Sequence, residues 1–179
     1  MKKLIASLAL SLGLIAATAA QENDGAKTLV MYFSWGGTTE KMAEMIAEST
    51  GADLWKIESE KKYPSIYPIC GYVVKRELDK GIIRQVKGSP DFSKYDTVFV
   101  GCPVWWHTAP TLVTNFLHEH TAELNEKTVI PFCTYASTSR AETLSALMEA
   151  TEKSEHREGL GLTKPSQEEV AAWLKKIGM

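Results

Sequence analysis

Three segments of the chain, residues 28–33, 95–101 and 127–133, are rich in apolar side chains, and the first of them is a nearly unbroken apolar run. Runs of this length and composition are typical of strands that helices cover on both faces of a sheet. Each run is followed by a loop and then by apolar residues at helical spacing, which favours parallel strands joined by right-handed crossovers. We therefore expect an α/β fold, a doubly wound three-layer sandwich, because 179 residues are few for an eightfold barrel.

Weaker patterns complete the expected alternation of strands and helices. They predict a helix that ends at Gly51, a strand at 52–57, a helix at about 71–80, a last strand within 155–162 and a C-terminal helix. The C-terminal helix has the clearest signal, because Ser166 and Glu169 form a capping box in front of its apolar face. The alternation gives five strand–helix units, and residues 58–94 are its least regular part.

The first 20 residues differ from the rest of the chain. Two lysines precede an apolar run that ends in small residues, which is the layout of a secretory signal peptide. A retained membrane anchor is the alternative, but the apolar run at 4–17 is short for a bilayer span. We expect cleavage near Ala20, a polar leader at 21–27 and one domain at 28–179. The protein is then bacterial, exported to the periplasm and without a stable membrane anchor.

Composition and charge exclude several classes of function. Removing the signal peptide takes away two lysines and changes the formal charge from −2 to −4, so the basic excess of a nucleic-acid-binding protein is missing. The three cysteines, Cys70, Cys102 and Cys133, are an odd number and cannot all pair in a disulfide framework. The four histidines have no metal-ligand spacing, and we expect no metal site.

The loop after the first apolar run has the residues of a phosphate-binding turn. It consists of Ser34, Trp35, Gly36, Gly37, Thr38 and Thr39. Adjacent glycines leave backbone N–H groups open to a ligand, hydroxyl groups add donors, and the N-terminus of the following helix favours an anion. The loop lacks lysine and the G-x-G-x-x-G spacing, so a terminal monophosphate fits better than a triphosphate or a dinucleotide. A plain strand-to-helix turn is an equal alternative for this loop alone.

Two further loops follow the other long apolar runs, and parallel strands bring such loops to one edge of a sheet. The second loop contains Pro103, Val104, Trp105, Trp106 and His107, and the third begins with Thr134, Tyr135 and Ala136. One of two adjacent tryptophans can pack inward while the other presents its ring to a planar ligand, although both can also serve packing alone. The three loops together indicate a phosphorylated planar heterocycle, and flavin mononucleotide (FMN) fits that description.

In these loops the chain resembles the flavodoxins, and most of all the branch with a Ser-Trp-Ser-Gly-Asn-Thr phosphate loop and a Pro-Ile-Trp-Trp second loop. The resemblance covers nearly all of residues 28–178. It implies a flavodoxin-like three-layer sandwich with a five-stranded parallel sheet in the order 2-1-3-4-5, and non-covalently bound FMN. It assigns the phosphate to Ser34, Gly36, Gly37, Thr38 and Thr39, and the isoalloxazine ring to residues 103–107 and 134–136.

The function that the resemblance implies is electron transfer, or hydride transfer to a quinone-like acceptor, without a catalytic protein nucleophile. The partner is then a redox protein or a small quinone-like molecule. One departure supports a second hypothesis, an exported binding module that has lost its flavin. The third loop has Tyr135-Ala136-Ser137 where the branch has His-Gly-Gly. Thiol chemistry at Cys102 and Cys133 is less favoured, because the chain has no C-x-x-C spacing.

Overall fold

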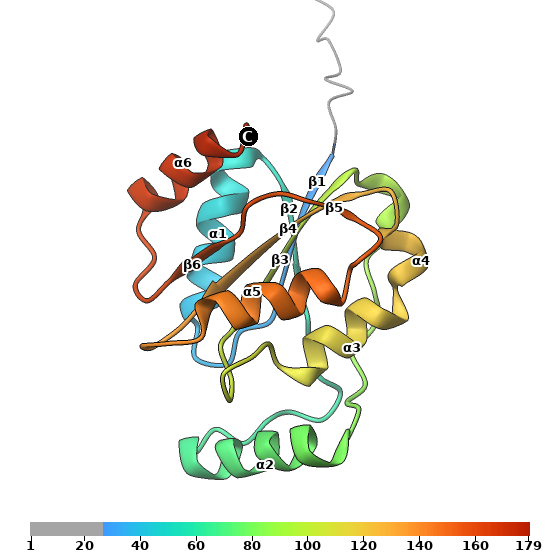
Figure 1. Cartoon of the computed structure of the whole chain (residues 1–179), viewed down its shortest axis with the longest axis vertical. Helices are drawn as coiled ribbons and strands as arrows, with labels where there is room; N and C mark the ends of the chain where they lie inside the picture. Colours follow the sequence, from blue (N-terminus) through green and yellow to red (C-terminus); the bar gives the residue numbers. More distant parts are fainter. Residues whose placement is uncertain (1–26) are drawn as a thin grey trace, which may run out of the picture.

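The computed structural model describes residues 27–179, which form a parallel sheet with helices around it (Figure 1). The strands are β1 (Thr28–Tyr32), β2 (Asp53–Lys56), β3 (Thr97–Pro103), β4 (Thr128–Thr134), β5 (Glu155–His156) and β6 (Leu160–Leu162). The helices are α1 (Thr38–Thr50), α2 (Tyr67–Lys80), the 3₁₀ turn η1 (Phe92–Lys94), α3 (Thr111–Glu119), α4 (Thr121–Leu124), α5 (Arg140–Glu149) and α6 (Gln167–Lys176). The signal peptide expected at 1–20 and the leader at 21–26 lie outside the described residues.

The strands follow the spatial order β2-β1-β3-β4-β5, with β6 also paired to β4. This confirms the predicted order 2-1-3-4-5, with the fifth position shared by two short strands. The direction of winding reverses between β1 and β3, so the loops after these two strands flank the switch point. Ligands of doubly wound sheets bind at such a point, which is where the first two predicted loops lie.

Helices cover both faces of the sheet, which confirms the three-layer sandwich. On one face, Val30 and Phe99 share a core with residues of α1 and α6. On the other face, Met31 and Val98 share a core with residues of α3 and α5. Because successive side chains of a strand point to opposite faces, neighbouring residues of one strand belong to different cores. All four side chains are fully buried, as the apolar runs predicted.

Helix α2 lies on neither face of the sheet. Figure 1 shows it beyond the carboxyl ends of the strands, at the opposite end of the molecule from the start of β1. It buries only Cys70, Val74 and Glu77. The helix begins at Tyr67, earlier than the predicted start near 71, because Pro68 fits the first turn of a helix, where no N–H partner is needed.

The predicted last strand is split into β5 and β6, and the break lies opposite Pro131 of β4. The Glu155 amide donates to the Lys127 carbonyl, and the Tyr135 amide donates to the Leu162 carbonyl. Odd-numbered residues of β4 therefore turn their backbone groups toward this edge of the sheet. Pro131 has no N–H to donate there, so the pairing stops and resumes one residue out of register.

Candidate functional site

A cavity of about 560 Å³ lies at the carboxyl edge of the sheet, within the range of roughly 300–1,000 Å³ that is usual for ligand sites. Its walls come from the three predicted loops and from α2. The loops contribute Trp35, Val104, Trp105, Trp106, His107, Ala136, Ser137 and Thr138. Helix α2 contributes Tyr67, Pro68, Cys70, Gly71, Tyr72 and Val74. The structure thus brings the three loops together and adds a wall from α2.

The first loop turns into α1 at Gly37, whose φ of 86° is one that other residues rarely adopt. Ser34 holds the turn, because its Oγ accepts a hydrogen bond of 3.1 Å from the Gly37 amide. The first amides of a helix have no intrahelical acceptor, and within residues 27–179 no side chain caps α1, so these N–H groups are available to a ligand. A Cβ atom placed on Gly36 would meet no other atom within 4 Å. The loop is therefore an open turn with N–H donors at a helix N-terminus, which suits an anion.

Two threonines of the predicted site connect the first and third loops. Thr39 is only 1% exposed, and its Oγ1 lies 2.7 Å from Oγ1 of Thr134 at the end of β4. One hydroxyl donates to the other and both residues are buried, so neither side chain is presented to a ligand. The Thr134 carbonyl also accepts a hydrogen bond of 2.8 Å from the amide of Val104, the residue after β3, which leaves the backbone amide of Thr39 in the first turn of α1 as the group that a ligand can use. Thr38, the first residue of α1, is exposed.

Glu40 brings a negative charge into the first turn of α1. Lys56 Nζ lies 2.6 Å from its Oε1, and the Tyr32 hydroxyl donates to the same oxygen from 2.9 Å. The hydrogen bond from Lys56 lowers the pKa of Glu40 below its usual value. The carboxylate is therefore ionised and paired, so it does not cancel the attraction of the helix N-terminus for an anion.

The second loop contains a tight two-residue turn. Trp105 and Thr108 exchange backbone hydrogen bonds of 2.9 and 3.1 Å, and Trp106 and His107 between them have φ values of 49° and 66°. Two positive φ values in succession define a type I′ turn, which normally holds Asn and Gly. Large side chains are strained in this conformation, and such strain concentrates at functional sites.

The two tryptophans of this loop point in different directions. Trp105 packs inward, with its ring nearly perpendicular to the rings of Phe33 and Tyr63 at centroid distances of 5.2 and 5.0 Å. Trp106 is 49% exposed, and its indole N–H donates to the Gly71 carbonyl of α2 from 3.0 Å. Trp106 therefore joins the second loop to α2 and closes one side of the cavity.

His107 joins the second loop to the third. Its Nδ1 lies 2.9 Å from Oγ of Ser139, a residue that also has a positive φ of 66°. In the third loop Ala136 lines the cavity, whereas the Tyr135 amide donates to the sheet. Pro103 is the last residue of β3 and does not line the cavity.

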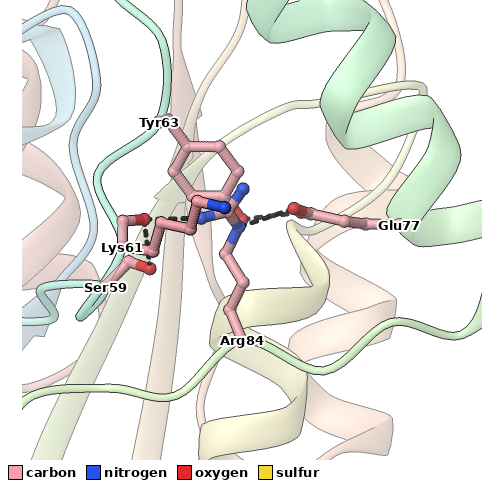
Figure 2. Close-up of polar contacts among 5 residues, drawn as sticks. All are labelled: Ser59, Lys61, Tyr63, Glu77 and Arg84. Atoms are coloured by element: carbon pink, nitrogen blue, oxygen red, sulfur yellow. Dashed lines mark hydrogen bonds and ion pairs between the residues drawn. The ribbon is translucent and has the colours of Figure 1, made fainter.

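A buried network holds α2 in place (Figure 2). Arg84 Nε donates to Oε1 of Glu77 from 2.5 Å, and the Tyr63 hydroxyl donates to Oε2 from 2.9 Å. The Arg84 guanidinium also lies 4.0 Å from the centre of the Tyr63 ring and donates to the Lys61 carbonyl. That carbonyl accepts a further hydrogen bond of 2.8 Å from Ser59. The network joins the segments on both sides of α2 to the helix.

We call residues 58–87, which include this network, the α2 lobe. The lobe is tied to the cavity through Tyr63, which contacts Trp105, and through Trp35, whose indole N–H donates to the Pro64 carbonyl from 3.0 Å. Burial raises the pKa of the Tyr63 phenol above its usual value, and the charge of Glu77 adds to this effect. The phenol therefore stays protonated and continues to donate to Glu77.

The residues of α2 are the part of the site that sequence reasoning missed. Their signal is the Tyr67-Pro68 pair, which places an aromatic residue at the start of a helix that begins with proline. The pair lies within residues 58–94, the least regular part of the predicted alternation, where the apolar residues have no clear helical period. Tyr67 and Tyr72 belong to the cavity wall although they are 78% and 71% exposed.

The three cysteines are free and buried. Cys102 and Cys133 are register partners on β3 and β4. Burial raises the pKa of the Cys133 thiol to about 12 and that of Cys102 well above its usual range. A thiol that stays protonated is a poor nucleophile, so the structure gives no support to thiol chemistry at this pair.

Within residues 27–179, no cluster of His, Cys, Asp or Glu side chains is suited to holding a metal ion. In the same part of the chain, no helix is long and apolar enough to cross a membrane.

The doubly wound sheet, the open glycine turn into α1 and the aromatic cavity at the switch point define the flavodoxin-like class of α/β proteins. The model of the flavodoxin family matches residues 27–67 and 75–177. The chain therefore belongs to the flavodoxin family.

Solved structures agree with this assignment. A protein from Bacteroides eggerthii, described as a flavoprotein, is 30% identical with a TM-score of 0.75, and the match covers 87% of this chain and 99% of that one. A flavoprotein from Lactobacillus acidophilus in complex with FMN is 21% identical with a TM-score of 0.72, over 87% and 100% of the two chains. A two-electron reduced flavodoxin from Megasphaera elsdenii is 22% identical with a TM-score of 0.53, over 83% and 98%. The last two show a shared fold. No curated protein matches the chain.

Proposed function

We propose that the protein binds FMN and transfers electrons, or a hydride to a quinone-like acceptor, through the flavin. The observation that carries this proposal is the position of the aromatic cavity beside the uncapped N-terminus of α1. A planar ring system and a phosphate attached to it can be held there together. The fold shared with the FMN complex from Lactobacillus acidophilus supports the same ligand.

Bound FMN would supply the redox chemistry, while the protein binds it and tunes it. The amides around Gly36 and Gly37 would hold the phosphate, since the space in front of Gly36 is open. Val104, Trp106 and Ala136 line the cavity and would contact the ring system. Trp105 also lines the cavity and packs against the core beneath it, which fixes this wall.

Titration with FMN and with riboflavin, which lacks the phosphate, tests this proposal. The protein is expected to bind FMN with micromolar or tighter affinity, to quench its fluorescence and to bind riboflavin at least about tenfold more weakly. Gly36→Asp places a carboxylate in the open space and should weaken FMN binding at least about tenfold by charge repulsion. Riboflavin binding should change little. Gly36→Ala is the matched control, because its Cβ meets no neighbouring atom, and it should bind FMN normally.

A second candidate function is a binding module without flavin. It is favoured by Ala136 and Ser137, which line the cavity at the two positions where the branch that the chain resembles has glycines. Failure to bind FMN at micromolar concentration, with the fold intact by circular dichroism, would overturn the flavin proposal in favour of this one.

We propose export to the periplasm and a quinone-like acceptor as further parts of this function. The N-terminal segment supports export, and N-terminal sequencing of periplasmic protein should then find a start near Gln21.

The aromatic wall formed by Tyr67, Tyr72 and Trp106 supports a planar acceptor. Chemically reduced, FMN-loaded protein should be reoxidised faster by a water-soluble benzoquinone than by an aliphatic oxidant of similar potential. Equal rates would contradict the acceptor class.

A further inference from the structure

The exposed apolar side chains of the protein gather on the α2 lobe. Of the nine large apolar side chains that are exposed within residues 27–179, six belong to this lobe. They are Ile66, Tyr67, Ile69, Tyr72, Ile82 and Ile83. Single exposed apolar residues are ordinary, but a concentration of them on one segment marks an interaction surface.

The α2 lobe is also basic, although the whole chain is acidic. Residues 58–87 carry seven lysines and arginines and four acidic residues, a formal charge of +3, whereas the chain has −2. Three of the acidic residues are paired within the lobe, as Glu77–Arg84, Asp79–Lys75 and Glu58–Lys87. Among the described residues, Lys61, Lys62, Arg76 and Lys80 form no ion pair, so four unpaired cations stand against one further carboxylate, that of Glu60.

Apolar and basic side chains of the lobe meet in a hollow of about 470 Å³ next to the cavity. Its lining includes Tyr72, Ile82 and Ile83 together with Lys61, Lys62 and Arg76. Tyr72 lines both the hollow and the cavity, so the two adjoin. The flavodoxin family model leaves residues 68–74 unmatched, and these residues include Ile69 and Tyr72. The apolar end of α2 is thus a feature of this chain beyond the family pattern.

We propose that the α2 lobe docks the protein reversibly on the surface of a lipid bilayer that contains anionic phospholipids. Isoleucine and tyrosine side chains enter the headgroup region, and the unpaired cations bind the lipid phosphates. The proposal goes beyond FMN binding and does not depend on it, because it rests on the exposed side chains and the charge of the lobe.

Other occupants of this surface fit less well. Five of the seven cations are lysines, which are depleted in protein–protein interfaces and frequent on membrane-binding surfaces. A second copy of the chain would bring two lobes of charge +3 face to face, which is repulsive. Docking on lipid also turns the Tyr72 side of the cavity toward the bilayer, from which a lipid-soluble acceptor can enter.

Co-sedimentation with vesicles tests the proposal. The protein used is the chain from Gln21 onward, which contains every described element of the fold. We expect it to sediment with vesicles of phosphatidylcholine and phosphatidylglycerol in equal parts, and not with vesicles of phosphatidylcholine alone. Raising the salt concentration should weaken binding, because exposed charges are screened.

Paired variants separate lipid docking from non-specific effects. Arg76→Glu/Lys80→Glu should weaken vesicle binding at least about thirtyfold, since each cation near an anionic surface contributes about a factor of five. Ile69→Ser/Ile83→Ser should weaken it without any change of charge. The matched controls are Lys153→Glu/Lys164→Glu and Leu54→Ser, which alter exposed residues outside the lobe and should bind like the unmodified chain.

Lack of binding to anionic vesicles would overturn the proposal, and so would equal losses in the lobe variants and their controls. Concentration-dependent dimerisation that the lobe variants abolish would assign the surface to a second copy instead. FMN titration of the same samples separates the lipid-docking proposal from the FMN-binding proposal, because each can fail while the other holds. The lobe variants replace residues that do not line the cavity and should bind FMN like the unmodified chain.

Discussion

The hydroxyl groups of Thr39 and Thr134 lie 2.7 Å apart in the interior and join the first turn of α1 to the end of β4. Both residues are buried, so neither hydroxyl has water as an alternative partner. Thr39→Val keeps the shape of the side chain but leaves the Thr134 hydroxyl without a partner. We expect the free energy of unfolding, measured by urea denaturation, to fall by about 1–3 kcal/mol.

The double variant Thr39→Val/Thr134→Val is the control for this pair. It leaves no unsatisfied hydroxyl, so its loss of stability should be clearly smaller than the sum of the two single losses. Additive losses would show that the two hydroxyl groups do not depend on each other.

The strained turn at Trp106 and His107 predicts a small effect on stability and a large effect on ligand binding. Trp106→Asn/His107→Gly installs the residues that a type I′ turn prefers. Relief of two strained positions should offset the lost contacts to Gly71 and Ser139, so the free energy of unfolding should fall by less than about 1 kcal/mol. FMN affinity should drop about tenfold, because an aromatic wall is removed. A large loss of stability with unchanged affinity would mean that these side chains serve the fold alone.

The buried ion pair of Glu77 and Arg84 predicts that α2 depends on one arginine. The two side chains are 5% and 11% exposed, so Arg84→Met leaves a carboxylate in the interior without its cation. We expect a loss of about 3–5 kcal/mol in the free energy of unfolding. Lys75→Met is the control, because the Lys75–Asp79 pair is 46% and 55% exposed and contributes less than about 1 kcal/mol. Similar losses in both variants would contradict this interpretation.

The buried thiols predict a loss of stability at alkaline pH. Burial raises the pKa of Cys133 to about 12 and that of Cys102 well above its usual range. In the unfolded chain both thiols ionise near pH 8.5, roughly, so the unfolded state releases protons that the folded state keeps. The free energy of unfolding therefore falls as the pH rises from about 8.5 toward 12, with a slope of up to about 1.4 kcal/mol per pH unit for each thiol.

Urea denaturation between about pH 9 and pH 11 checks this prediction. Cys102→Ala/Cys133→Ala should show a shallower decline than the unmodified chain. Tyr32 and Tyr63, whose pKa values are also raised by burial, contribute equally to both proteins and cancel in the comparison. Parallel curves would show that the thiols do not titrate differently in the two states.

The sheet and its two covering layers were predictable because their side chains are buried in a regular pattern. Strands β1, β3 and β4 are covered on both faces, so their apolar runs are visible without knowledge of any partner. The meeting of the three loops followed from the parallel order of the strands. Pro131 alone does not predict the split of the last strand. The split follows only when it is known that the backbone of Pro131 faces β5 and β6, where an N–H donor is missing.

The α2 wall of the cavity was not predictable from periodicity. The pattern predicted a helix at about 71–80, but it gave no place for that helix in the site. Only Cys70 and Val74 among its apolar residues are buried, and Tyr67, Ile69 and Tyr72 are exposed, so the stripe that indicates which surface a helix packs on is missing. Its position depends on single long-range contacts, such as those from Arg84 to Glu77 and from Trp106 to Gly71. The type I′ turn at Trp106 and His107 could not be predicted from the sequence either, because neither residue is one that usually occupies such a turn.

The interruption opposite Pro131 has a consequence for how the folded chain meets other chains. A long flat edge strand offers unpaired N–H and C=O groups on which a neighbouring molecule can add a strand and begin aggregation. Here one rim of the sheet offers only β5 and β6, of two and three residues, and the other rim is β2, of four residues. Neither rim presents a template of useful length. The proline in β4 breaks one rim and the shortness of β2 limits the other, and together they give the protein resistance to intermolecular strand addition.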